Sequence, residues 1–302
     1  MTESVSGTIG PYRLLSRLGA GGMAEVFLAV AYGASGFEKR VAIKTLLPEL
    51  RGNARLQRLL IEEARLGARL HHRNLVQVHD LGVVDGVYFV RMDYVDGRDL
   101  GALVQRGRPL PGLALLIAEE VALALRHVHR AVDDEGRPLG LVHRDISPAN
   151  ILLSREGEVK LADFGVAKAT MLADVTQANV RKGKYAYMSP EQVRGDPLTA
   201  RSDQFSLGVT LVELLTGARP YDGETPLQTM DLIRAAEPPA LTGVDEPLRA
   251  LVLRCLAADP SARFDDDEAL IGAIAACRAT QPATFVALGR WVQEEMKSTV
   301  DS

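Results

Sequence analysis

Hydrophobic positions follow two different periods along this chain. From Tyr12 to Tyr94, short runs rich in valine, leucine and aromatic residues are separated by glycine and aspartate turns, a pattern typical of β-strands. The expected strands cover residues 12–18, 25–31, 40–46, 76–84 and 87–94. Residues 54–70 interrupt them, because their leucine and alanine positions recur at the three- and four-residue spacing of an amphipathic helix.

After Gly97 the pattern becomes helical, with apolar residues at helical spacing between loops that contain proline and glycine. The expected helices cover residues 113–131, 202–216, 225–235, 247–257, 266–279 and 284–296. The change of pattern predicts an α+β fold with a small strand-rich lobe and a larger helical lobe, and a cleft at the linker between them. The expected boundaries are a disordered leader at 1–11, lobes at 12–93 and 98–278, a linker at 93–97 and a helical extension at 279–302.

Composition narrows the class of protein without identifying it. The 302 residues are 47% hydrophobic and 25% charged, as in an ordinary soluble globular protein. A net charge of −4 gives no general attraction to nucleic acid or to an anionic membrane. We expect no membrane-spanning segment, because no apolar run is long enough. Two cysteines are too few for a disulfide framework, so the cytoplasm is the expected compartment.

The residues with the clearest chemistry lie between positions 143 and 165. The triplet His-Arg-Asp at 143–145 is followed by Asn150 and then by Asp-Phe-Gly at 163–165. Any one of these polar residues is more often a turn or cap residue. Together they suit in-line phosphoryl transfer, which needs a proton acceptor such as Asp145 and side-chain oxygens, such as those of Asn150 and Asp163, to hold Mg²⁺ on the phosphates.

Two patterns in the strand-rich part suit a nucleotide. The run Gly-Ala-Gly-Gly-Met-Ala at 19–24 lies between two expected strands. Glycines there would let backbone N–H groups approach phosphate oxygens closely, although a flexible hairpin explains the run equally well. Lys44 follows the apolar run Val-Ala-Ile at 41–43. A lysine on such a strand either extends to solvent or holds an anion.

The ordered motifs resemble those of the bacterial eukaryotic-like serine/threonine protein kinases, over about residues 12–278. The resemblance implies a bilobal kinase fold that uses ATP and Mg²⁺ and transfers the γ-phosphoryl group to a hydroxyl of a protein substrate. It implies Asp145 as the catalytic base. It also implies that Lys44 holds the α- and β-phosphates and pairs with Glu63, nineteen residues later, with Glu62 as a competing partner.

The resemblance also implies a set of ligand contacts. The linker backbone would bind the adenine edge, Met92 would be the gatekeeper beside it, and Asp99 would lie near the ribose. Val26 would be an apolar lid over the base, although Ala24 stands where the kinase pattern has its third glycine. The full expected nucleotide set is Leu18, Gly19, Gly21, Val26, Ala42, Lys44, Met92, Asp93, Val95, Asp99 and Leu152, and the expected metal ligands are Asn150 and Asp163.

Two further expectations concern structural support. The sequence Ser-Pro-Glu at 189–191 matches the end of a kinase activation segment. Glu191 is expected to form a buried ion pair with Arg263, a stabilising rather than a catalytic contact. Asp203 is expected to hold the backbone of the catalytic loop in place.

Regulation is expected within the activation segment. Arg144 precedes the base and Lys168 follows Asp163 by five residues, so two cations could bind one phosphate. Thr176, in the middle of the segment, is the expected phosphorylation site that would order the loop, and the alternative is a solvated loop threonine. The expected partners are protein substrates and a transient homodimer for autophosphorylation.

Positions 147 and 184 also depart from the kinase pattern. Ser147 stands where serine/threonine kinases carry a lysine that touches the γ-phosphate, and Lys184 stands where they carry a threonine that bonds to that lysine. A cation and a hydroxyl have exchanged places, so Lys184 could deliver its ammonium to the same spot. Two other interpretations stay open at this point. One is a catalytically silent pseudokinase that binds partners, and the other is a small-molecule phosphotransferase of related fold.

Overall fold

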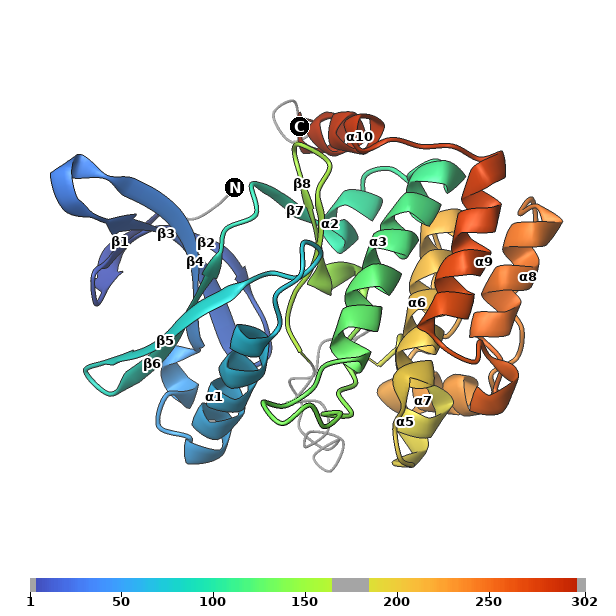
Figure 1. Ribbon diagram of the computed structural model, residues 1–302, viewed down its shortest axis with the longest axis horizontal. Coiled ribbons are helices and arrows are strands. Elements are labelled where there is room, and N and C mark those ends of the chain that lie inside the picture. Colours follow the sequence, from blue (N-terminus) through green and yellow to red (C-terminus); the bar gives the residue numbers. More distant parts are fainter. Residues whose placement is uncertain (1–3, 165–184, 298–302) are drawn as a thin grey trace. The chain divides into compact units, whose positions relative to one another are not determined.

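The computed structural model describes residues 4–164 and 185–297, and these fold into two units (Figure 1). The first unit holds the described residues up to 71, residues 76–95 and Phe164, and the second holds 72–75, 96–163 and 185–297. Strands dominate the first unit and helices dominate the second, which confirms the expected α+β fold class.

The first unit is one antiparallel sheet with one helix. The sheet has the strand order β1-β2-β3-β4-β6-β5, and helix α1 packs on β4, β5 and β6. Its apolar core forms where alternate residues of the central strands meet, because successive side chains of a strand point to opposite faces. The elements are β1 (Ser4–Ile9), β2 (Tyr12–Ala20), β3 (Ala24–Tyr32), β4 (Glu38–Leu46), α1 (Ala54–Arg69), β5 (Val78–Val84) and β6 (Val87–Asp93), with 3-10 turns η1 (Ala34–Gly36) and η2 (Pro48–Leu50).

Strand β1 corrects the expectation of a disordered leader over residues 1–11. It pairs antiparallel with β2, and Ile9 lies opposite Tyr12. Gly10 has a φ of +54°, a left-handed conformation that glycine adopts easily, and this lets the chain reverse between the two strands. Ile9 packs on the sheet's apolar core. The six-residue strand was missed because so short a segment shows too little alternation to stand out.

The second unit is helical around a small sheet of order β7-β8-β9. Helix α3 lies at its centre against α6 and α9, and most of its residues are buried. The elements are β7 (Gly97–Asp99), α2 (Leu100–Val104), α3 (Pro111–His129), η3 (Pro148–Asn150), β8 (Ile151–Ser154), β9 (Val159–Leu161), α5 (Pro190–Arg194), α6 (Ala200–Thr216), α7 (Pro226–Ala235), α8 (Glu246–Cys255), η6 (Pro260–Ala262), α9 (Asp267–Thr280) and α10 (Phe285–Lys297).

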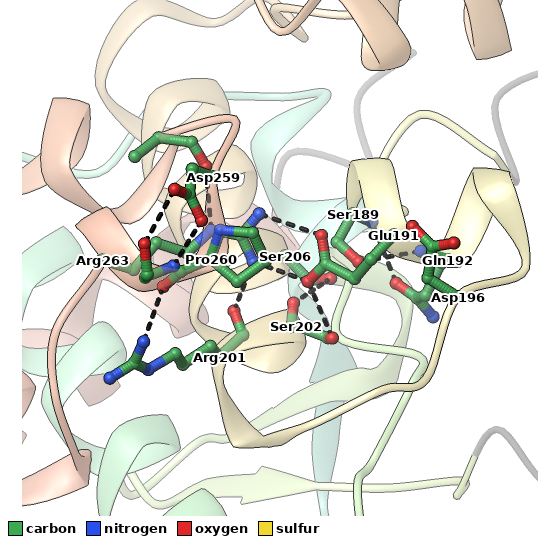
Figure 2. Close-up of polar contacts among 12 residues, drawn as sticks. Ser189, Glu191, Gln192, Asp196, Arg201, Ser202, Ser206, Asp259, Pro260 and Arg263 are labelled. Atoms are coloured by element: carbon green, nitrogen blue, oxygen red, sulfur yellow. Dashed lines mark hydrogen bonds and ion pairs between the residues drawn. The ribbon is translucent and has the colours of Figure 1, made fainter.

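A buried ion pair ties α5 to the loop that precedes α9. Arg263 Nη1 lies 2.6 Å from Glu191 Oε1, and the arginine side chain is fully buried. Ser202 of α6 donates its hydroxyl to the same carboxylate at 2.8 Å, as Figure 2 shows. The guanidinium also donates to the backbone carbonyls of Ala257 and Arg201. The expected Glu191–Arg263 pair is therefore confirmed, and all three guanidinium nitrogens donate hydrogen bonds, which a buried charge needs.

Within residues 4–164 and 185–297, no single helix is both long and apolar enough to cross a membrane. Helices α9 and α10 meet that requirement only when taken together, and they bend by 81° where they join.

Candidate active site

Lys44 and Glu63 form the ion pair expected between β4 and α1. The ammonium of Lys44 lies 2.7 Å from Glu63 Oε1, and only 7% and 11% of the two side chains are exposed. Asn53 caps α1 by accepting the backbone N–H groups of Arg55 and Leu56. Glu62 is exposed, so the competing partner is excluded. A buried cation is thus held at a defined place on the sheet.

The register of the sheet gathers four of the expected nucleotide contacts on one face. Val26 of β3 lies directly opposite Lys44 of β4, and Met92 of β6 lies opposite Ala42. Ala42 and Lys44 are two residues apart on one strand, so their side chains point to the same side. The opposite face carries the apolar core, which includes Val41 and Ile43. Val26, Ala42, Lys44 and Met92 therefore line a single surface.

The glycine run forms the turn of the β2–β3 hairpin. Gly19 pairs with Val26, and the backbone N–H of Gly21 donates to the carbonyl of Ala24 at 2.7 Å. A β-carbon added at Gly19 or Gly22 would meet no atom within 4 Å. The space beside this backbone is open on the protein side, as the close approach of a phosphate requires. Leu18, the preceding residue, is 39% exposed.

Asp93 ends strand β6 and is anchored by two contacts. Its backbone N–H donates to the carbonyl of Gln77 at 2.9 Å, and its Oδ1 lies 2.6 Å from Nε2 of His79. The N–H of Asp93 is therefore bonded to Gln77, directly before β5, and is not available to donate to a ligand. Val95, two residues on, is half-buried.

Residues 143–145, called the catalytic loop because they include the expected base Asp145, are held from two sides in the second unit. The carboxylate of Asp203 accepts the backbone N–H groups of His143 and Arg144, at 2.7 and 2.9 Å, as expected. Gln192 Nε2 donates to the carbonyl of Arg144 at 3.0 Å. Arg144 has a φ of +68°, which is strained for a residue with a side chain and persists only where neighbours enforce it. Because these contacts fix the backbone of Arg144, they also fix the direction in which the chain continues into Asp145.

Asn150 and Asp163 both lie at the open end of the β8–β9 hairpin, one before β8 and the other after β9. The side-chain Nδ2 of Asn150 donates to the carbonyl of Asp145 at 2.8 Å, so the amide oxygen is the atom oriented to accept a cation. The backbone N–H of Ala162 donates to the carbonyl of Asn150 at 2.8 Å, which brings the neighbouring Asp163 close. Asp163 has a φ of +55°. An amide oxygen and a carboxylate are oxygen ligands that suit Mg²⁺.

Asp99 and Leu152 are paired opposite each other between β7 and β8. Oδ1 of Asp99 accepts the backbone N–H of Ala102 at 2.8 Å and caps helix α2. This structural role was not expected from the sequence, and the ribose contact of Asp99 stays a prediction.

His129 is a buried residue that sequence analysis missed. Its Nε2 lies 2.8 Å from Asp203 Oδ2, and its Nδ1 lies 3.0 Å from Asp267. Burial alone lowers the pKa of the imidazole, but the two carboxylates outweigh burial and raise the pKa to about 9. His143 shows the opposite, because burial dominates and lowers its pKa. The sequence signal that could have identified His129 is that it is a polar residue on the buried side of an apolar helix.

The remaining site predictions fall partly outside the described residues. Gly165, Lys168, Thr176 and Lys184 all lie between 165 and 184, which the structure does not describe. Ser147 is described, is buried, and accepts the backbone N–H of Asn150 through its carbonyl at 3.0 Å.

Comparison with known proteins agrees with this geometry. Residues 12–271 match the sequence profile described as "Protein kinase domain". Tyrosine-protein kinase MasK of Myxococcus xanthus is 42% identical over 88% of this chain and 42% of MasK, and serine/threonine-protein kinase PrkC of Bacillus subtilis is 36% identical over 86% of this chain and 39% of PrkC. The crystal structure of the Mycobacterium tuberculosis PknI kinase domain aligns with a TM-score of 0.65 at 29% identity, over 91% of this chain and 99% of that one. The chain thus spans about two-fifths of these curated relatives' length.

Proposed function

Because the chain belongs to the protein kinase family, we propose that it transfers the γ-phosphoryl group of ATP to serine or threonine residues of proteins, itself included. Relatives named serine/threonine-protein kinases, from Bacillus subtilis and Mycobacterium tuberculosis, are 36% and 35% identical. The Myxococcus relative is named a tyrosine kinase, so the identity of the accepting hydroxyl has to be measured.

The observation that carries the proposal is the buried ion pair between Lys44 and Glu63 at 2.7 Å. Burying a charged side chain is unfavourable unless the charge is paired, so a buried ion pair on this sheet calls for a functional explanation. A pseudokinase that only binds partners does not require a preoriented cation on the sheet. A kinase does, because such a cation aligns the phosphates for in-line transfer.

Each remaining polar residue has a proposed role in the reaction. Asp145 accepts the proton of the substrate hydroxyl, and Asn150 and Asp163 hold the metal through their oxygens. Mg²⁺, when bound, neutralises charge on the phosphates. Lys184 supplies the cation that position 147 lacks. The proposed contacts to the nucleotide come from ten residues of the glycine turn, the sheet, the linker and β7–β8: Leu18, Gly19, Gly21, Val26, Ala42, Met92, Asp93, Val95, Asp99 and Leu152.

The test is incubation of purified protein with γ-labelled ATP, Mg²⁺ and a general protein acceptor, with Asp145→Asn as the control. We expect label on phosphoserine and phosphothreonine with the wild type and almost none with the variant. Label on phosphotyrosine would change the proposed acceptor. Absence of transfer by folded, ATP-binding wild type would favour a pseudokinase and overturn the proposal.

We further propose that phosphorylation of Thr176 activates the enzyme, with Arg144 and Lys168 binding the phosphate. In this proposal one copy phosphorylates another within a transient homodimer in the cytoplasm. The rate of autophosphorylation would then rise with the square of the protein concentration. Thr176→Ala should lower activity, whereas Thr170→Ala, in the same segment, should not. Phosphopeptide mapping of fully active wild type with Thr176 unmodified would exclude this switch.

A further inference from the structure

Helix α10 lies beyond the stretch that matches the kinase profile, which ends at residue 271. It nevertheless packs on β7, β8 and α2 (Figure 1). Its apolar side is well covered, because Leu288 and Val292 are fully buried and Trp291 is 9% exposed. The helix is therefore an integral part of the second unit.

The backbone of α10 lies close against the turn that joins β8 to β9. A β-carbon at Gly289 would lie 2.7 Å from the carbonyl oxygen of Arg155 and 3.0 Å from the backbone of Glu156 and Gly157. Real β-carbons essentially never come as close as 2.7 Å to another atom, and a distance of 3.0 Å is tighter than most of their contacts. Gln293, one turn further along the helix, donates from Nε2 to the same Arg155 carbonyl at 2.8 Å. The helix backbone thus lies directly on the turn and also hydrogen-bonds to it.

The turn is the closed end of a hairpin whose open end carries two residues of the proposed site. Ile151 pairs with Leu161 at the open end. Asn150 immediately precedes β8, and Asp163 follows β9 by two residues. A three-pair hairpin places the open end only about 13 Å from the turn. A shift of the turn therefore reaches both proposed metal ligands through the short, continuous strands.

A second route leads from the same turn to the linker segment. Arg155 donates its backbone N–H to the carbonyl of Asp96 at 2.8 Å, and its Nε lies 3.5 Å from Asp96 Oδ1. Asp96 precedes β7, which pairs Asp99 with Leu152 of β8. Arg155, which α10 contacts, is thus bonded to Asp96, directly before the strand that ends at Asp99.

We infer that α10 is a positioning element for the nucleotide: by fixing the Arg155–Gly157 turn, it holds Asn150, Asp163 and the Asp99–Leu152 pair in place. The inference rests on the proposed function, since it concerns affinity for ATP and its metal. None of the α10 residues touches the ligand in this scheme, so the helix acts through β8 and β9.

The test compares two glycine-to-alanine substitutions in helices of the full chain. Gly289→Ala adds a methyl group against the turn, whereas Gly272→Ala in α9 adds one in open space, with no atom within 4 Å. Alanine has the higher helix propensity at both positions, so intrinsic helix stability changes in the same direction. Gln293→Ala is a milder variant that removes one hydrogen bond without adding volume. KM for ATP, kcat, melting temperature and the Kd for AMP-PNP with Mg²⁺ are measured for all four proteins.

We expect Gly289→Ala to raise the KM and the AMP-PNP Kd about two- to tenfold, with kcat at saturating ATP changed less than about twofold. Gln293→Ala should shift both constants in the same direction by less, and Gly272→Ala should match the wild type. Lowered melting temperatures with unchanged KM and Kd would make α10 a structural support only and overturn the inference. If Gly289→Ala does not fold, Gln293→Ala decides by the same criterion. Wild type that transfers no phosphoryl group would instead contradict the proposed function.

Discussion

Arg144 and Asp163 both adopt left-handed backbone conformations, with φ of +68° and +55°. Each costs on the order of 1 kcal/mol for a residue with a β-carbon. For Arg144 the compensating bonds are visible, because Asp203 accepts its N–H and Gln192 donates to its carbonyl. The strained backbone of Arg144 is therefore next to the proposed base, and it fixes the direction in which the chain continues into Asp145.

The Lys44–Glu63 pair leads to a prediction that can be tested by substituting Lys44 and each of the two neighbouring glutamates, Glu62 and Glu63. Lys44→Met should leave the fold intact and lower phosphoryl transfer about 10²-fold or more, because it removes one preorganised charge contact. Glu63→Gln should also lower the rate, since the ammonium loses its partner. Glu62→Gln should have no effect, because Glu62 is exposed. Initial rates with labelled ATP check this, and an active Lys44→Met enzyme would rule out the assignment.

The exchange of residue types at positions 147 and 184 makes a prediction about turnover. If Lys184 supplies the cation that serine/threonine kinases carry at position 147, Lys184→Thr should lower kcat about 10²-fold, equivalent to about 3 kcal/mol. Adding Ser147→Lys to that variant should restore much of the activity, so the two effects are not additive. The measurement is kcat for both single variants and the double variant. Wild-type turnover in Lys184→Thr would show that Lys184 is an ordinary surface charge.

At the scale of elements, the buried pair of Glu191 and Arg263 joins α5 to the rest of its unit. Arg263→Met should destabilise the protein by about 3–5 kcal/mol, because it leaves a buried carboxylate without its cation. Arg194→Met, in the same helix α5, should cost less than about 1 kcal/mol, because its partner Asp196 is exposed. Urea unfolding measures both, and equal effects would contradict the prediction.

The same pair predicts sensitivity to acid. Burial raises the pKa of Glu191, but the hydrogen bond and charge of Arg263 outweigh it, and the net shift is downward. A lowered folded-state pKa contributes stability that is present above the ordinary glutamate pKa and is lost as the pH falls through the lowered value.

Most long elements were predictable from the sequence, and most short ones were not. The expected helices at 202–216 and 225–235 agree with α6 and α7 to within two residues, because ten or more residues show a clear period. Strands β7 and β9 have three residues each, too few for any pattern. Lys44, Glu63 and Asp203 could be assigned from their motifs. His129 and Gln192 could not, because their roles depend on partners that only the folded chain brings together.

At the scale of the whole molecule, His129 connects α3 with α6 and α9 and, through Asp203, with the catalytic loop. A folded-state pKa raised from 6.5 to about 9 contributes stability that is fully present below pH 6.5 and is lost as the pH rises through about 9. The contribution is on the order of 3 kcal/mol. His129→Gln should therefore be less stable than wild type at pH 6, and the difference should shrink toward pH 10.

Urea unfolding across that pH range measures the difference. His71→Gln, at an exposed position outside this network, is the control and should follow the wild-type curve. Wild-type and His129→Gln curves that run parallel between pH 6.5 and 9 would contradict the prediction.

The contact between α10 and the region of α2 also constrains how the protein is made. Arg106 Nη1 donates to the carbonyl of Glu295 at 2.7 Å, across 189 residues of sequence. Synthesis proceeds from the N-terminus, so the six-stranded sheet and α1 are complete in sequence once residue 93 has been added. The turn between β8 and β9 can be covered by α10 only after α10 has left the ribosome. Strands β7, β8 and β9, which carry or adjoin residues proposed to bind the nucleotide and its metal, are thus among the last parts of the second unit to gain all their contacts during translation.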